Sequence, residues 1–319
     1  PPRSTLFPYT TLFRSAFFGI TIIAYLLATL MPGSPLDLLV QPETRVSAEE
    51  LAEIEHRMGL DKPVIIQYFY WLKNLLMGNF GTSYSQHRPV LELIKARIGP
   101  TLLLSFSALL VGVLISVPLG MIAGYKSYSG WDYGSTILAF AGQAAPNFFV
   151  ALLLIYIFAV KLKVLPVSGM YDAGSSGSVG ELLRHMCMPC LALAFQHIGI
   201  YTRQMRNSMV ECMSDDYVRT ARAKGVSERK LLFKHVLRNA LLPLVTQVGL
   251  SLAMLAGGAI VTEQVFSWPG MGTLMLNAIK GRDYPLIMGI TVVISLVVLI
   301  GNLVVDLIYR ALDPRIDDK

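Results

Sequence analysis

The stretch 214–243, SDDYVRTARAKGVSERKLLFKHVLRNALLP, is the longest strongly charged run of the chain, and long apolar segments flank it. Basic residues outnumber acidic ones within it. The spacing predicts a short amphipathic helix over 216–224, a stop at Gly225, and a second helix that begins after Ser227 and enters the next apolar segment near Pro243. A plain basic loop does not need this helix–glycine–helix order. The spacing therefore leaves two interpretations open, a plain basic loop or a docking element for a partner.

The composition indicates a membrane protein. Of the 319 residues, 54% are hydrophobic and only 15% are charged, whereas soluble domains carry about 25% charged residues. The net charge of +6 does not indicate nucleic-acid binding, because the basic residues lie beside apolar spans, where lysine and arginine set topology. Three cysteines make no disulfide framework, and CMPC at 187–190 begins a predicted span, so we expect apolar packing of these thiols rather than a redox or metal site.

The N-terminal residues have an unusual sequence. The chain begins PPRSTLFPYTTLFRS without an initiating Met, and residues 5–15 resemble the translation of a common sequencing-library adapter. We expect residues 1–15 to be an adapter-derived artefact and 16–31 to be a truncated first transmembrane helix. A continuous native reading frame through these codons would contradict this interpretation.

Hydropathy predicts six membrane-spanning helices, since a span needs about 20 apolar residues. They are 16–31, 101–124, 135–160, 187–206, 241–262 and 286–309, and the fourth is the least regular. The loop 207–240 is richest in lysine and arginine, so we place it in the cytoplasm together with both chain ends. The predicted organisation is then an external helical segment over 32–100, a transmembrane domain over 101–310 and a cytoplasmic tail over 311–319.

The external segment shows two helical patterns. The first begins at Ser47, with Glu50 three residues later as in a capping box, and stops at Gly59. The second, PVIIQYFYWLKNLLMG from Pro63, is rich in aromatic residues that suit a membrane surface.

No catalytic or cofactor-binding constellation is visible in the sequence. The histidines are scattered, and neither HExxH nor the phosphate-binding pattern GxxxxGK[ST] occurs. We therefore expect no catalytic residue, no metal site and no cofactor bound by this chain. Any ATP would be bound by another subunit.

Polar residues within the predicted spans have two interpretations. They either bond to a neighbouring helix or line a translocation path, because unpaired polar groups are costly in hydrocarbon. The candidates are Gln143, Asn147, Gln196 and Gln247. Glycines in the spans are expected to allow close helix packing, at Gly120, Gly124 and 257–258. The turn SWPGMG at 267–272 is expected to be external, with Trp268 as an interfacial anchor or, with Pro269 and Gly270, as part of an external mouth.

The basic stretch resembles the cytoplasmic loop of the inner-membrane permease subunits of binding-protein-dependent ABC importers. The general E-A-A-x(3)-G pattern reads here Arg219-Thr220-Ala221-(x3)-Gly225, and the downstream I-x-L-P reads His235-Val236-Leu237-Arg238. These departures fit the peptide branch, whose loop resembles DYVRTARAKG…HxLRNALLP. Similar motifs of the B-type subunit of dipeptide and oligopeptide importers follow in order after residue 16: PGSPLD, GLDKP, QYFYWL, GNFGTSY, RPVLELIKARIGPTLLLS, FSWPGMG and RDYPL.

The resemblance implies a non-catalytic, all-α permease in the bacterial inner membrane that forms half of a translocation path. Its implied partners are a C-type permease subunit, two subunits that bind ATP and Mg²⁺, an external substrate-binding protein and membrane lipid, with no nucleic acid. The coupling helix would sit in a groove of an ATP-binding subunit through Tyr217, Arg219, Thr220, Ala221, Lys224 and the turn at Gly225. ATP binding shifts the spans only if it stabilises one state more than the other.

Three alternatives remain beside a peptide importer. Nickel and glutathione importers share the same subunit type. A secondary transporter typically has an intramembrane carboxylate or lysine for ion coupling and inverted repeats, and neither feature is clear in the sequence. A membrane-embedded hydrolase requires paired catalytic groups at bilayer depth, and the predicted spans contain no such pair.

Overall fold

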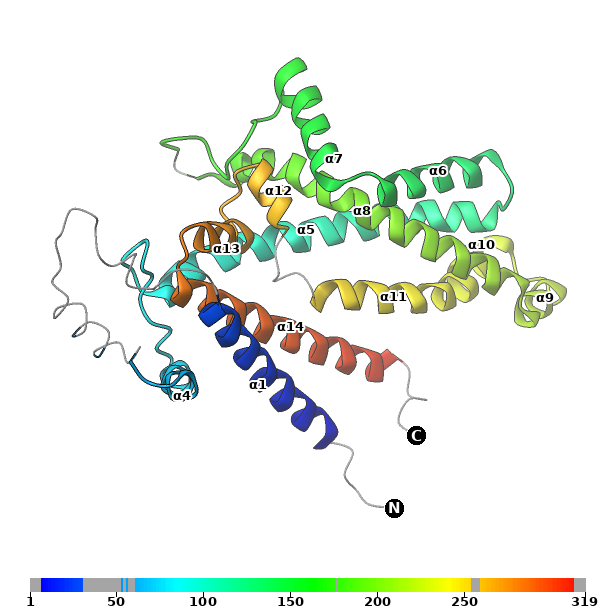
Figure 1. Ribbon diagram of the computed structural model, residues 1–319. Helices are drawn as coiled ribbons and strands as arrows, with labels where there is room; N and C mark the ends of the chain where they lie inside the picture. The colour runs from blue at the N-terminus through cyan, green and yellow to red at the C-terminus, as the bar shows by residue number, and fades with distance from the viewer. Residues whose placement is uncertain are drawn as a thin grey trace. The chain divides into compact units, whose positions relative to one another are not determined.

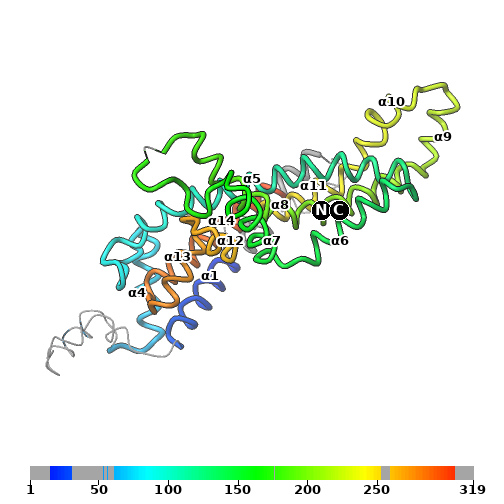
Figure 2. Tube along the Cα trace, turned by 90° about the horizontal axis from the view of Figure 1, so that it is seen from above, coloured from blue at the N-terminus to red at the C-terminus, as the bar shows by residue number. Residues whose placement is uncertain are grey.

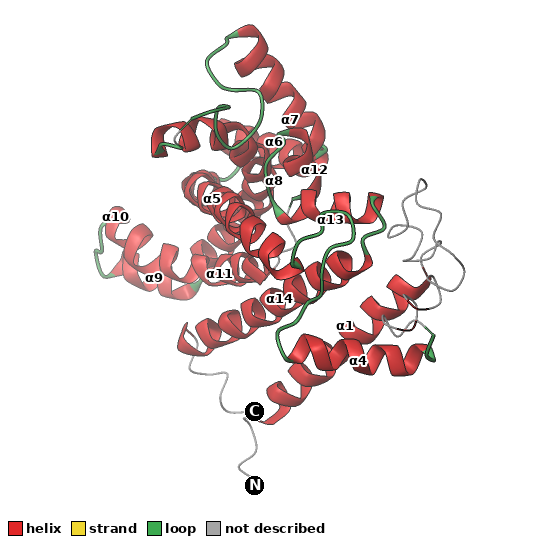
Figure 3. Cartoon of the chain, turned by 90° about the vertical axis from the view of Figure 1, so that its left-hand side faces the viewer, coloured by secondary structure: helices red, strands yellow, loops and turns green. Residues whose placement is uncertain are grey.

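The structure is a computed structural model that describes residues 7–30, 53, 56, 61–175, 177–253 and 259–312, with side chains from residue 15 and up to residue 305. The regular elements of these residues are helices, and their β pairing is an isolated bridge between Thr82 and Pro89 (Figure 3). The all-helical prediction is thus confirmed for the described residues. Most of the helix predicted from Ser47 lies outside them. The chain folds as two compact units, residues 1–99 with 270–300 and residues 100–269 with 301–319.

The first unit brings the N-terminal helices together with two helices from the C-terminal part of the sequence. Its helices are α1 (Phe7–Leu30), α4 (Val64–Leu76), the first turns of α5 (Val90–Tyr125), α13 (Met271–Lys280) and the first part of α14 (Tyr284–Leu312). Buried side chains from three of these helices pack together, among them Val90, Ile94, Met271 and Leu286. Helix α4 confirms the aromatic helix that the sequence predicts. Its Tyr68 contacts Thr21 of α1, where the two hydroxyl oxygens lie 3.0 Å apart.

Asp283 joins two motifs of the first unit that are about 200 residues apart in sequence. Its carboxylate is fully buried and accepts hydrogen bonds from the hydroxyls of Ser83 and Ser85 at 2.6 and 2.7 Å. The backbone N–H groups of Tyr84 and Ser85 add bonds of 3.1 and 3.0 Å. The N–H of Leu286 donates at 3.3 Å, so Asp283 also caps the first turn of α14. These donors satisfy a buried polar group and link GNFGTSY to RDYPL.

The second unit is built around one long helix, α8 (Val179–Ser214). The others are α6 (Gly130–Ala144), α7 (Asn147–Leu154), the π-helical η1 (Ile155–Lys161), α9 (Asp216–Ala223), α10 (Glu228–Lys230), the π-helical η2 (Leu231–Val236), α11 (Leu237–Ala253) and α12 (Ile260–Val265). Helices α6, α7, α11 and α12 all pack against α8. At the end of the α8 and α11 pair, α9 and α10 form a projecting corner (Figures 1 and 2).

Glycines let the backbones of neighbouring helices approach α8. A Cβ at Gly142 of α6 would lie 2.6 Å from the Phe195 carbonyl oxygen, and one at Gly199 would lie 2.7 Å from that of Ala139. On α5, a Cβ at Gly120 or Gly124 would lie 2.6 or 2.4 Å from a methionine Cβ of α8. The expected packing role of these two α5 glycines is confirmed, whereas residues 257–258 lie outside the described residues.

An ion pair reinforces the contact between α6 and α8. Arg206 donates from Nε and Nη2 to the two carboxylate oxygens of Asp132, at 2.7 and 2.8 Å. The backbone N–H of Tyr128 donates to the same carboxylate at 2.8 Å. Asp132 is 3% exposed, so the paired geometry satisfies a carboxylate that burial alone would destabilise.

Two described helices, α5 and α14, are long and apolar enough to cross a bilayer, with hydropathies of 2.4 and 2.6. The pair formed by α6 with α7 and η1 makes a third if it counts as one span. The described part of α1 is apolar but shorter, and α8 carries Gln196, His197 and Arg203 within its length. The count of six spans therefore stays a prediction.

Two predicted spans are not single straight helices. The span 135–160 bends by 106° between α6 and α7, because Pro146 lacks an N–H and disfavours helical geometry at Ala145, whose backbone is extended. Within the span 241–262, Ala259 has a non-helical backbone directly before α12, which begins at Ile260. A further helix, α13, lies in the segment that the sequence interprets as a turn and an external loop.

Replacing Asp283 by alanine is expected to destabilise the protein by about 2–4 kcal/mol, because the α14 cap is lost and buried hydroxyl and N–H groups lose their acceptor. The measurement is thermal unfolding of the purified protein in detergent. Asp215→Ala is the matched control, because Asp215 occupies the N-cap of α9 but its side chain makes no capping bond. Equal unfolding temperatures for the two variants would contradict the role given to Asp283.

Gly142→Leu is expected to lower the unfolding temperature in the same assay, because the new side chain meets the α8 backbone and overpacking costs about 1–3 kcal/mol. Gly134→Leu on the same helix is the control, since a Cβ at Gly134 meets nothing within 4 Å. An unchanged unfolding temperature for Gly142→Leu would show that the close approach of α6 and α8 is unimportant for stability.

Candidate functional site

The basic stretch folds as the sequence predicts, with a short helix, a glycine stop and a second helical run. Helix α9 ends at Ala223 with Lys224 as its C-cap residue, and Gly225 has φ of +73°, a left-handed conformation that glycine adopts without strain. The N–H of Gly225 donates to the Arg222 carbonyl at 3.0 Å, and that of Val226 donates to Ala221 at 3.1 Å. This pair of bonds is a Schellman motif, which satisfies the last carbonyls of α9 and turns the chain.

The six residues predicted to couple to a partner divide between two faces of α9. Arg219, Thr220, Lys224 and Gly225 are exposed. Tyr217 and Ala221 are half-buried and pack against the apolar cluster that contains Val218, Leu231 and Val236. On the exposed face, Arg219 lies 3.6 Å from the Asp216 carboxylate and the Thr220 hydroxyl donates to the Asp216 carbonyl, so these contacts stay within α9. Ala221 instead helps to hold α9 against its own unit.

An ion pair closes the corner between α9 and α10, and the sequence analysis did not single it out. Arg222 donates from Nε and Nη2 to the two carboxylate oxygens of Glu228, at 2.7 and 3.3 Å. The hydrogen bond that Arg222 donates to Glu228 raises the pKa of the Arg222 guanidinium, which stays charged. The two residues are six positions apart on either side of Gly225, a spacing that becomes a contact only after the chain turns.

The second helical run continues from the corner into the apolar segment. It comprises α10, η2 and α11, with Leu231 and Val236 buried and Pro243 inside α11. Ser227 occupies the N-cap position of α10, as predicted, but its side chain makes no capping bond. Because this run joins the apolar cluster under α9, a displacement of α9 would act directly on α11.

Three of the four polar residues predicted within spans meet at the junction of α6, α7 and α8. Asn147 donates from Nδ2 to Oε1 of Gln196 at 3.1 Å. Gln143 donates from Nε2 to the carbonyl of Gly199 at 3.3 Å. The fourth, Gln247, lies apart from them on α11, half-buried. These bonds are interhelical, and a role of the four residues in a translocation path stays a prediction.

A cavity of about 330 Å³ lies between α6 and α8, beside the Asp132–Arg206 pair. Its wall combines aromatic and cationic side chains, including Tyr133, Phe140 and Arg203. No motif in the sequence indicates this cavity, because its lining residues come from two helices that are distant in sequence.

Trp268 is a core residue, which corrects the expectation of an interfacial anchor. Its side chain is fully buried, packs with Leu104 and Ile198, and donates from Nε1 to the Pro100 carbonyl at 3.0 Å. Pro269 follows in the turn, and Gly270 is the N-cap residue of α13 in the first unit. A role of these three residues at an external mouth stays a prediction.

The cysteines show no redox arrangement. Cys187, Cys190 and Cys212 are free thiols, and Cys190 packs in the same cluster as Trp268. Apolar packing of the CMPC segment is therefore confirmed for Cys190.

Comparison with known proteins identifies the family. Residues 116–318 match the family described as "Binding-protein-dependent transport system inner membrane component", and residues 14–105 match the N-terminal family of such membrane components. The chain is 44% identical over 299 residues to a putative peptide permease protein of Brucella suis biovar 1 (strain 1330), covering 93% of this chain and 94% of the relative.

Two further relatives carry different substrate names. The oligopeptide transport system permease protein AppB of Bacillus subtilis (strain 168) is 39% identical, with 94% of each chain covered. The glutathione transport system permease protein GsiC of Salmonella choleraesuis (strain SC-B67) is 37% identical, again with 94% of each chain covered.

The fold is similar to a solved structure of an inward-facing MetNI methionine ABC transporter, with a TM-score of 0.57 and 16% identity over 70% of this chain and 97% of that one. The helical fold, the apolar helices α5 and α14, and matches that together cover most of the sequence agree with one another. The chain belongs to the family of multi-pass inner-membrane components of binding-protein-dependent transport systems.

Proposed function

We propose that this chain is one permease subunit of an ATP-driven importer of dipeptides or oligopeptides. The observation that carries the substrate class is similarity over more than nine-tenths of the chain to relatives named as peptide and oligopeptide permeases. The subunit supplies half of the translocation path and no catalytic group. Gln143, Asn147, Gln196 and Gln247 are the residues we propose for that path.

The proposed partners are a second, C-type permease, two ATP-binding subunits and an external substrate-binding protein. Membership of the family supports a partnership of this kind. In this assembly ATP and Mg²⁺ are bound and ATP is hydrolysed by the partner subunits, while both ends of this chain lie in the cytoplasm. Trp268, Pro269 and Gly270 belong to the turn that we place at the external mouth.

The proposed coupling element is the corner formed by α9, Gly225 and α10. Its exposed face carries Arg219, Thr220 and Lys224, and we propose that this face docks in a groove of an ATP-binding subunit. Tyr217 and Ala221 support it from the buried side, through the cluster that also holds Leu231. Movement of the docked corner is then transmitted through η2 into α11, since these elements pack as one cluster.

Glutathione is the second candidate substrate. The relative GsiC is named for glutathione transport and is nearly as similar to this chain as AppB is. Family membership alone does not distinguish the two, because substrate choice depends on path-lining and binding-protein contacts rather than on the fold.

Uptake of labelled substrates in a strain that lacks this gene, complemented with the wild-type chain, tests the substrate class. We expect restored uptake of dipeptides or longer peptides, with glutathione and nickel uptake unchanged. Restoration of glutathione or nickel uptake alone would overturn the peptide proposal while leaving the transporter role intact.

Gly225→Pro is expected to abolish uptake and the stimulation of the partner ATPase, while the protein still inserts in the membrane. Proline cannot adopt φ of +73° and has no N–H to donate to Arg222, so the corner between α9 and α10 is lost. The matched control is Gly225→Asn, because asparagine tolerates the left-handed conformation and keeps the N–H. Full coupling in Gly225→Pro would contradict the docking role of this corner.

A further inference from the structure

The loop between η1 and α8 is anchored in the second unit by Gly169. Its N–H donates to the Phe266 carbonyl at 2.7 Å, at the end of α12. Its own carbonyl oxygen lies 3.1 Å from Nδ1 of His185, in the second turn of α8. The two backbone groups of Gly169 therefore tie the loop to α12 on one side and to the His185 imidazole of α8 on the other.

The hydrogen bond to Gly169 determines which nitrogen of His185 is free. A carbonyl oxygen can only accept, so Nδ1 carries the proton, and in a neutral ring Nε2 carries a lone pair. The His185 side chain is 3% exposed, and Nε2 has no hydrogen-bond partner among the described residues. Nε2 lies 3.3 Å from Oδ1 of Asp172, so in a neutral ring a lone pair faces a carboxylate oxygen, and either a proton on Nε2 or a cation between the two atoms relieves this repulsion.

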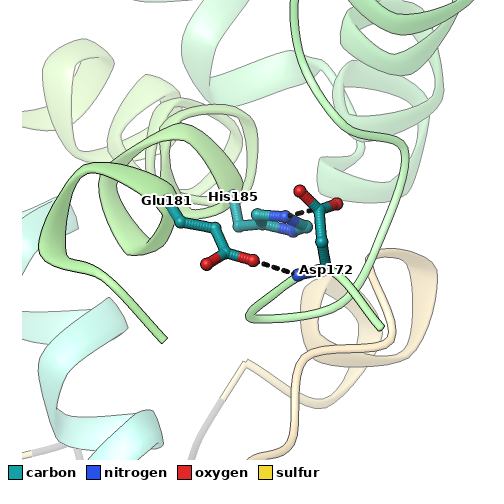
Figure 4. Close-up of side chains that lie close together, drawn as sticks. All are labelled: Asp172, Glu181 and His185. Atoms are coloured by element: carbon teal, nitrogen blue, oxygen red, sulfur yellow. Dashed lines mark hydrogen bonds and ion pairs between the residues drawn. The ribbon is translucent and has the colours of Figure 1, made fainter. Parts of the chain in front are cut away.

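Glu181 completes the arrangement from one turn earlier on the same face of α8. Its two carboxylate oxygens accept from the hydroxyl of Ser175 and the backbone N–H of Asp172. Figure 4 shows Glu181 and His185 on the helix and Asp172 on the loop, with the Glu181 carboxylate at the Asp172 backbone nitrogen and the His185 ring beside the Asp172 carboxylate.

The three candidate ligand atoms lie close together, and one pair of them has the spacing that a small metal ion sets. One ligand atom from each of Asp172, Glu181 and His185 lies within 4.8 Å of the others. Tetrahedral zinc with bonds of about 2.0–2.2 Å sets neighbouring ligand atoms about 3.3–3.5 Å apart, and the Nε2–Oδ1 distance of 3.3 Å matches this separation. The exposed side of Asp172 leaves room for water as a fourth ligand.

We propose that Asp172, Glu181 and His185 bind one divalent transition-metal ion, with Zn²⁺ as the best match to one imidazole and two carboxylates. An imidazole ligand disfavours Ca²⁺ and Mg²⁺, which prefer oxygen ligands. Gly169 is the outer partner that orients His185, as metal-bound histidines require. The ion fastens the loop to α8, and this proposal departs from the sequence-based expectation of no metal.

Zinc binding by the full-length chain tests this proposal without any transport assay. The protein is purified in detergent without a polyhistidine tag, stripped with a chelator, and titrated with Zn²⁺, with Ca²⁺ and Mg²⁺ as comparison ions. We expect about one Zn²⁺ per chain, and X-ray absorption at the zinc edge with one nitrogen among oxygen ligands. His185→Gln, Glu181→Gln and Asp172→Asn are each expected to weaken zinc binding about tenfold or more.

His56→Gln is the matched control, because His56 also contacts an aspartate, Asp61 at 2.7 Å, but both side chains are exposed. We expect its zinc affinity to equal that of the wild type. Asp172→Asn guards against misfolding, since the Asp172 side chain is 69% exposed and its replacement disturbs no core packing.

Two results would overturn the proposal. Wild-type protein that takes up no Zn²⁺ would show that His185 and Asp172 are a simple ion pair. Undiminished zinc binding in Asp172→Asn and Glu181→Gln would show that the metal binds elsewhere on the chain.

Discussion

The approach of neighbouring backbones to α8 is the contact on which the second unit depends. Gly142 and Gly199 allow α6 and α8 to touch, and Gly120 and Gly124 do the same for α5. In lipid the hydrophobic effect does not drive helices together, so association rests on close van der Waals packing and interhelical hydrogen bonds. Small residues at the crossing allow the close van der Waals packing. The helices are then near enough for polar groups such as Asn147 and Gln196 to form a hydrogen bond.

In both units a buried carboxylate is satisfied by several hydrogen-bond donors. Asp283 in the first unit collects hydroxyl and N–H donors from a distant loop, while Asp132 in the second is paired with Arg206. Each carboxylate is tolerated because its partners satisfy it, and each fixes the position of a helix end or a loop. Removing one partner leaves a charged or polar group unsatisfied, which is why such contacts are specific as well as stabilising.

The charge and the shape of the corner formed by α9, Gly225 and α10 have different causes. Its many lysines and arginines are explained by its predicted cytoplasmic position, because cytoplasmic loops are enriched in these residues. Its shape comes from Gly225, whose left-handed backbone ends α9, and from the Arg222–Glu228 pair that closes the turn. Ala221 belongs to the packing that holds α9 in place, so the residues available to a partner are those on the opposite, exposed face.

The sequence alone determined the helical class, the helix–glycine–helix corner and the aromatic helix α4, because periodicity and turn residues act over a few neighbouring positions. Only the tertiary structure showed that the span at 135–160 bends at Pro146 and that Trp268 is buried. The Asp283 cluster and the convergence of Asp172 with His185 also required it. These contacts join residues from separate elements, and no local pattern records which elements meet, since that depends on how whole helices pack.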